Sequence, residues 1–135
     1  MKTINYFILL AFLISLGSCA TYAKFSISPI TPAADGTARI TKDRNKNYVV
    51  EVTVKYLANP DRLTPPRALY VVWISTDKGN PINVGMLKSG SNDKAYLQTV
   101  SSSRPTQIFV TAESIGDTSW PGNEEIFHTE YIKLR

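Results

Sequence analysis

The chain has 135 residues, 43% of them hydrophobic, and its 15 Lys and Arg against 11 Asp and Glu give a net charge of +4. This length predicts one folded domain. The basic residues are scattered among acidic ones along the sequence, which argues against a nucleic-acid partner, and the single cysteine excludes an internal disulfide.

The first 18 residues have the pattern of an export signal. Lys2 precedes an apolar run over residues 6–16 that is too short to span a bilayer, and small residues follow it. Leu16, Gly17, Ser18 and Cys19 resemble the bacterial lipoprotein signal, which implies cleavage before Cys19 and lipidation of its thiol. The alternative is an ordinary secretory signal cut after Ala20 or Ala23.

We therefore predict a lipoprotein signal peptide over residues 1–18, an anchor with a short linker or edge strand over 19–33, and a β-sandwich domain over 34–135. Without Lys2 the mature chain has 14 basic and 11 acidic side chains, a weakly basic balance. The expected location is the cell envelope, lipid-anchored on a periplasmic or surface face, with secretion to the periplasm as the alternative.

Short alternating runs separated by Gly, Pro, Asn and Ser predict an all-β chain. Residues 48–57 alternate clearly, while 69–76 is apolar on both faces and should be a central strand, with either Tyr70 or Trp73 pointing into the core. Further strands are expected at residues 25–30, 37–41, 82–88, 95–100, 108–113 and 126–134. Seven or eight strands at this spacing favour an immunoglobulin-like two-sheet antiparallel β-sandwich.

The residues that could carry chemistry are few. His128 is the only histidine, and in an alternating strand it is more typical of a structural residue than of a general base. Asp43, Asn45 and Asn47 have calcium-loop spacing, but Tyr48 and Val54 stand where such a loop needs Gly and Glu, so a hairpin turn is the better interpretation. We predict no enzyme activity, no metal and no small-molecule cofactor.

The competing hypothesis is a small envelope hydrolase or carbohydrate-binding protein. It would bring Glu113 and Glu124 together with His128 in one pocket, and Glu125 is a further carboxylate nearby in sequence. A third hypothesis is a packing domain within an envelope complex, which a large exposed apolar patch would favour.

Two loops are candidates for binding a partner. The proline-rich segment over residues 57–67 is stiff, and Trp120 stands in the loop before Pro121 and Gly122. Trp120 is expected to plug the end of the sandwich; if it is exposed instead, it would be the first surface to test. The predicted interaction surface consists of Trp120, Pro65, Pro66, Arg62 and Arg67.

About half of the mature chain resembles the extracytoplasmic C-terminal domain of anti-sigma-K-type factors. The resemblance lies in residues 70–74, 79–81, Gly85, 109–113, Gly116 and 121–122, with Leu57, Pro60, Leu63 and Pro65 before them. It implies a β-sandwich that acts as an interaction or sensing module, with an envelope protein as partner. The chain departs from the family because the sigma-binding and membrane-spanning regions are missing and Ile115 replaces a Gly of the usual pair.

Overall fold

The computed structural model describes residues 19–91 and 93–135, and within them the regular structure is β-strand apart from one short 3-10 turn, η2 (Pro60–Arg62). The predicted signal peptide lies outside the described residues. The strands, in chain order, are β1 (Thr21–Lys24), β2 (Asp35–Lys42), β3 (Tyr48–Lys55), β4 (Leu69–Thr76), β5 (Gly79–Met86), β6 (Lys88–Ser89), β7 (Lys94–Ser101), β8 (Gln107–Glu113) and β9 (Glu125–His128).

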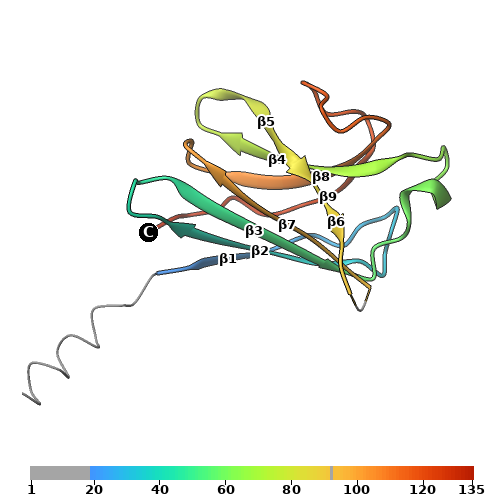
Figure 1. Ribbon diagram of the computed structural model, residues 1–135, viewed down its shortest axis with the longest axis horizontal. Helices are drawn as coiled ribbons and strands as arrows, with labels where there is room; N and C mark the ends of the chain where they lie inside the picture. Colours follow the sequence, from blue (N-terminus) through green and yellow to red (C-terminus); the bar gives the residue numbers. More distant parts are fainter. Residues whose placement is uncertain (1–18, 92) are drawn as a thin grey trace, which may run out of the picture.

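The strands form two antiparallel sheets that pack face to face (Figure 1). One sheet has the order β1-β2-β3-β7-β6 and the other β5-β4-β8-β9. If β2 is matched to the first strand of a constant-type immunoglobulin sandwich, these orders agree with that fold apart from two added edge strands, β1 in one sheet and β5 in the other. The predicted two-sheet antiparallel sandwich is confirmed, with β1 and the two-residue β6 bringing the described strands to nine.

The core lies between the sheets and follows from the period-two alternation of the strands. Val50, Val52 and Val54 of β3 are at most 1% exposed and meet Tyr70, Val72 and other apolar residues of β4. The remaining members come mainly from β2, β8 and β9: Ala38, Ile40, Ile108, Val110, Ala112, Ile126 and Phe127. Tyr70, rather than Trp73, is therefore the aromatic residue of β4 that points into the main core.

Trp73 lies on the opposite face of β4, in a second apolar cluster with Val71 and Phe109, and is fully buried there. Its indole Nε1 donates a 2.8 Å hydrogen bond to Thr111, whose hydroxyl donates to Glu113. The loop over residues 114–124 is fastened beside this cluster, because Asn83, opposite Trp73 on β5, donates to two carbonyls of that loop. Trp73 therefore does not lie between the two sheets, unlike the buried Trp of immunoglobulin domains.

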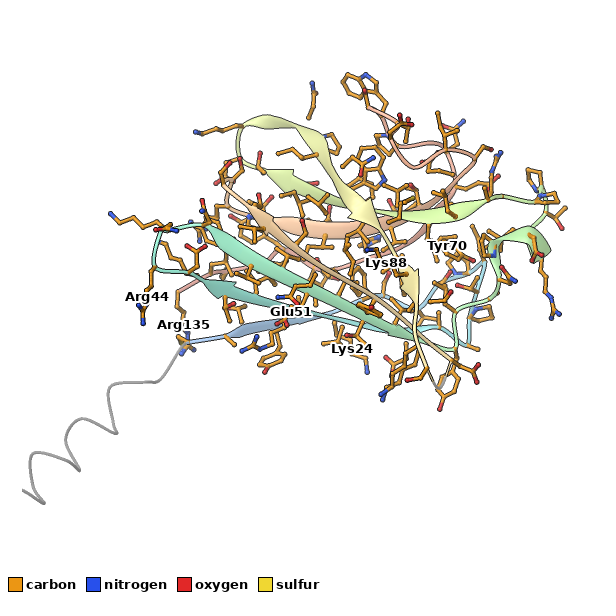
Figure 2. All side chains as sticks on the ribbon, in the orientation of Figure 1. Lys24, Arg44, Glu51, Tyr70, Lys88 and Arg135 are labelled. Atoms are coloured by element: carbon orange, nitrogen blue, oxygen red, sulfur yellow. The ribbon has the colours of Figure 1, made fainter. Side chains whose placement is uncertain are left out.

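The sandwich has two opposite ends (Figure 1). The first, called here the N-terminal pole, contains the start of β1, residues 43–47, 77–78, 102–106 and the C-terminal segment 129–135. The second, called the cleft pole, contains residues 56–68, 90–91, 93 and 114–124. Figure 2 shows Arg44 and Arg135 at the N-terminal pole, with Tyr70 and Lys88 toward the other end.

Three strand predictions are corrected by the structure. The expected edge strand at residues 25–30 is absent, because Pro29 and the neighbouring turn break it, and residues 21–24 form the edge strand instead, with only an isolated bridge from Phe25 to Thr129. Strand β3 ends at Lys55 because Tyr56 has a positive φ of 56°, and β9 ends at His128, six residues earlier than expected. The strand over 69–76 has its predicted bounds.

Candidate interaction surface

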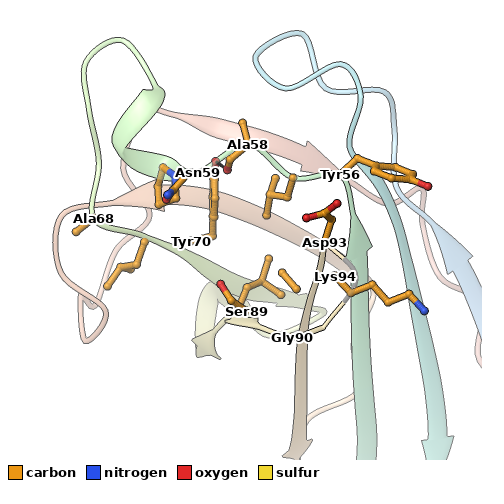
Figure 3. Close-up of a pocket in the computed structure, with 14 residues that line it drawn as sticks. Tyr56, Ala58, Asn59, Ala68, Tyr70, Ser89, Gly90, Asp93 and Lys94 are labelled. Carbon is orange, nitrogen blue, oxygen red and sulfur yellow. Dashed lines mark hydrogen bonds between the residues drawn. The ribbon is translucent and has the colours of Figure 1, made fainter.

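The cleft pole contains an open cleft of about 530 Å³ between the edges of the two sheets (Figure 3). Four chain segments meet around it: residues 56–60 after β3, 68–70 entering β4, 87–90 around β6, and 93–95 entering β7. Among the described residues, the charged side chains that line it are those of Asp93 and Lys94. Backbone groups, apolar or small side chains and the neutral polar side chains of Tyr56, Asn59 and Tyr70 supply the rest, which suits an extended peptide better than a highly charged ligand.

Two lining residues hold the backbone in the left-handed region without being glycine. Tyr56 and Asp93 both have φ of 56°, and the Tyr56 amide donates a 3.1 Å hydrogen bond to the Asp93 carbonyl. A bulky residue with positive φ is an outlier that its surroundings must hold in place, and such outliers gather at binding sites. The geometry turns the Tyr56 side chain out of β3, so that it is 63% exposed.

Tyr70 forms the inner wall of the cleft and ties β4 to the loop that follows β3. Its hydroxyl donates a 2.7 Å hydrogen bond to the Ala58 carbonyl, toward which the ring points in Figure 3. Only 5% of the residue is exposed. Burial disfavours the phenolate and raises the pKa of Tyr70 to about 12.

An ion pair joins the two loops that were predicted to bind a partner. The Arg67 guanidinium donates to Glu124 at 2.7 Å, and both side chains are partly buried. The pKa of Arg67 is raised above its ordinary value by this hydrogen bond, with smaller Coulombic contributions from Glu124 and Glu113. Glu113 also accepts hydrogen bonds from Thr111 and from the Gly122 amide, so the carboxylates hold the 114–124 loop in place.

The predicted surface residues divide into two groups. Arg62, Pro65 and Pro66 are exposed on the proline-rich loop, where the Thr64–Pro65 peptide is cis, whereas Arg67 is half-buried and acts as the tie to Glu124. Trp120 is 61% exposed. The expectation that Trp120 plugs the sandwich is therefore wrong, because Trp73 and Phe109 already fill the space beneath its loop.

Near Trp120 along the chain, the same loop exposes a second apolar side chain. Ile115 is 61% exposed, and the adjoining Gly116 packs against Met86 of β5, which is itself 41% exposed. A Cβ on Gly116 would stand only 2.3 Å from the Met86 sulfur, so a larger residue there would require the flexible Met86 side chain to move. The loop therefore carries exposed apolar groups on a backbone that is fixed at both ends.

The residues of the hydrolase hypothesis do not converge. Glu113 and Glu124 are engaged with the 114–124 loop and with Arg67, whereas the His128 imidazole pairs with Glu125 and stands opposite Phe109 in the sheet. None of the three lines the cleft. A carboxylate pair with a histidine base in one pocket is thus not formed by these side chains.

The calcium-like spacing belongs to a hairpin turn, as expected. One carboxylate oxygen of Asp43 accepts hydrogen bonds from the amides of Asn45 and Asn47, at 2.8 and 2.9 Å. This is the local side-chain-to-backbone bonding that makes Asp a turn residue. Within residues 19–91 and 93–135 no group of three or more His, Cys, Asp or Glu side chains is placed to hold a metal ion.

Comparisons with protein-family models, with curated proteins and with solved structures returned no match. Among the described residues, no helix is long and apolar enough to cross a membrane. The fold is therefore established by the structure, while the resemblance to the anti-sigma-K-type domain stays a prediction.

Sequence reasoning missed the cleft itself. Its lining comes from segments that are separated by up to 39 residues along the chain, and the left-handed Tyr56 has no signature in sequence, since this conformation favours Gly or Asn. The sequence gives one indication of this region, which is that the alternation of apolar and polar residues ends at Leu57.

Proposed function

We propose that the protein is a non-enzymatic, lipid-anchored envelope lipoprotein whose sandwich recognises a protein partner through its cleft pole, in the manner of an anti-sigma-factor C-terminal domain. The observation that supports the proposal is that the N-terminal pole and the cleft pole lie at opposite ends of the sandwich. Cys19 is exposed and stands two residues before β1, whereas the cleft and the exposed loops lie at the other end. An acylated Cys19 would therefore hold the sandwich at a membrane and present the cleft pole away from it.

The tether is shorter than the sequence alone indicated. Five residues were expected between Cys19 and the first strand, but β1 begins at Thr21, so Ala20 is the whole linker. Two residues of extended chain span about 7 Å. A lipid on Cys19 would thus restrict the domain to the membrane surface and limit its orientations.

The recognition surface is supported by rigidity together with exposure. Arg67 and Glu124 join the proline-rich loop to the 114–124 loop, so Trp120 and Pro65 are displayed on an ordered support. A preordered surface loses less entropy on binding, and Trp and Arg are the residues that most often dominate binding energy.

Site-specific photo-cross-linking in intact cells tests this proposal. A photoreactive amino acid is placed at Ile115, and a matched variant carries it at Val100, which is similarly exposed on β7 at 58%. The proposal predicts one discrete cross-linked species of an envelope protein from Ile115 and none from Val100. Identical patterns from both positions, or none from either, would contradict recognition at the cleft pole.

The hydrolase alternative has no comparable support, since its three residues are apart. The anti-sigma comparison concerns the type of domain, and the proposed partner is an envelope protein.

A further inference from the structure

The basic side chains that are scattered along the sequence gather at one end of the folded molecule. The N-terminal pole carries seven exposed basic residues against three acidic ones, a net side-chain charge of +4. The basic ones are Lys42, Arg44, Lys46, Lys78, Arg104, Lys133 and Arg135, and the acidic ones are Asp43, Asp77 and Glu130. The rest of the described chain has seven basic and eight acidic side chains, so the entire positive excess lies at this pole.

The fold produces this gathering through three hairpin or loop connections and the end of the chain. Antiparallel pairing of β2 with β3 sets Lys42, Arg44 and Lys46 at one turn, and the β4–β5 turn adds Lys78 at the same end. The C-terminal segment is held there too, because the Ile132 amide donates to Thr106 and Arg104 donates to the Leu134 carbonyl. Figure 2 shows Arg44 and Arg135 on this side.

We propose that the N-terminal pole docks on the anionic headgroups of a phospholipid bilayer. Charge complementarity selects this occupant, and the chain enters the sandwich at the same pole, with Thr21 opening β1 next to Ile40 of β2. A lysine or arginine near an anionic bilayer contributes about 1 kcal/mol, and this attraction falls off within about a Debye length, near 10 Å at 0.1 M salt. The exposed ring of Tyr131, at 60%, adds an amphipathic group suited to the headgroup region.

The docked orientation follows from the fold. The inference uses the proposed anchor only to bring the domain to a bilayer, and the one-residue linker, Ala20, would then hold the start of β1 within a Debye length of the headgroups. Contact at the pole stands the strands upright on the surface and directs the cleft outward. A tether alone would let the domain tumble over the hemisphere that the linker allows.

Vesicle co-sedimentation tests the docking without the lipid anchor. The protein used is residues 19–135, which contain every described strand and core residue, with Cys19→Ser so that acylation has no part in the result. Vesicles of phosphatidylcholine alone are compared with vesicles that contain phosphatidylglycerol. We expect sedimentation with the anionic vesicles only, and its loss in 0.5 M salt.

Charge-reversal variants localise the contact. Arg44→Glu with Lys46→Glu alters the tip of the hairpin, and the matched control Lys88→Glu with Lys94→Glu makes the same change in net charge near the cleft. The first variant should lower the partition coefficient by about thirtyfold or more, and the control by less than threefold.

Equal losses in both variants, equal binding to neutral vesicles, or no binding to anionic vesicles would overturn the inference. Binding to a DNA duplex at lower protein concentration than to anionic vesicles would do the same, by indicating a general polyanion site. None of these results bears on whether Cys19 is acylated. The hypothesis of docking can therefore fail while the hypothesis of a lipid anchor still holds, and the reverse is also true.

Discussion

Tyr70→Phe is the substitution whose consequences the structure defines most closely. It keeps the ring that packs in the core and removes the hydroxyl that donates to the Ala58 carbonyl at 2.7 Å. A hydrogen bond of this kind contributes about 1 kcal/mol net to stability, so at pH 8 the variant should unfold about 1 kcal/mol more easily than the wild type.

The same hydroxyl makes that difference depend on pH. Its pKa is raised from about 10 in the unfolded chain to about 12 in the folded protein, because burial disfavours the phenolate. Above pH 10 the unfolded chain loses this proton while the folded protein keeps it, so the stabilisation that is complete below pH 10 is lost as the pH rises toward 12. A pKa that is one unit higher in the folded protein corresponds to at most about 1.4 kcal/mol in the free energy of unfolding. The figure is smaller where solvent reaches the hydroxyl through the cleft.

The wild type and Tyr70→Phe should therefore converge near pH 11. Urea unfolding followed by circular dichroism at pH 8, 9, 10 and 11 measures the difference directly, and the other six tyrosines cancel in the comparison. A difference that stays constant from pH 8 to pH 11 would refute the account of Tyr70 as a buried, neutral phenol.

Four further substitutions test the packing and the surface. Gly36→Ala should destabilise the protein by about 1–2 kcal/mol in thermal unfolding, because its Cβ would stand 2.8 Å from the Phe25 ring. Unchanged stability would show that the stacked rings of Phe25 and Phe127 can move apart without destabilising the fold. Thr111→Val should lower the free energy of unfolding by about 2 kcal/mol, because it leaves the buried Trp73 indole without an acceptor. When Trp73→Phe is combined with Thr111→Val, the double-mutant cycle should show that the two effects are coupled. Additive effects would contradict the hydrogen bond from Trp73 to Thr111. Trp120→Ala should change stability by no more than about 0.5 kcal/mol while removing the cross-link from Ile115, and a large stability loss would mean that Trp120 is a packing residue after all.

The fold was largely readable from the sequence because alternation reports burial directly. Val50, Val52 and Val54 alternate with polar residues, and β4 is apolar on both faces because each face covers a separate cluster. The errors fall where tertiary contacts overrule local pattern. Tyr56 continues the alternation of β3 but is turned out by its positive φ, and the two faces of β4 look alike until the 114–124 loop is seen to cover Trp73.

The site was harder to predict because it is formed by residues that are far apart in the sequence. The exposed Trp120 and the proline-rich loop were visible as unusual residue types, but the Arg67–Glu124 tie spans 57 positions in sequence and has no local signature. The basic pole was missed for a related reason. Its residues alternate with acidic ones along the chain, and only the antiparallel connections bring the basic turns to one end.

Anchoring of the sandwich through Cys19 at its N-terminal pole can be tested by the mass of the mature N-terminus. The full chain is expressed in a bacterium with a lipoprotein pathway, purified from membranes and digested, and its N-terminal peptide is measured. We expect a mature protein that begins at Cys19 and carries a diacylglyceryl thioether, and we expect the Cys19→Ser protein to lack this modification. A mature N-terminus at Thr21 or Lys24, or an unmodified Cys19, would contradict it.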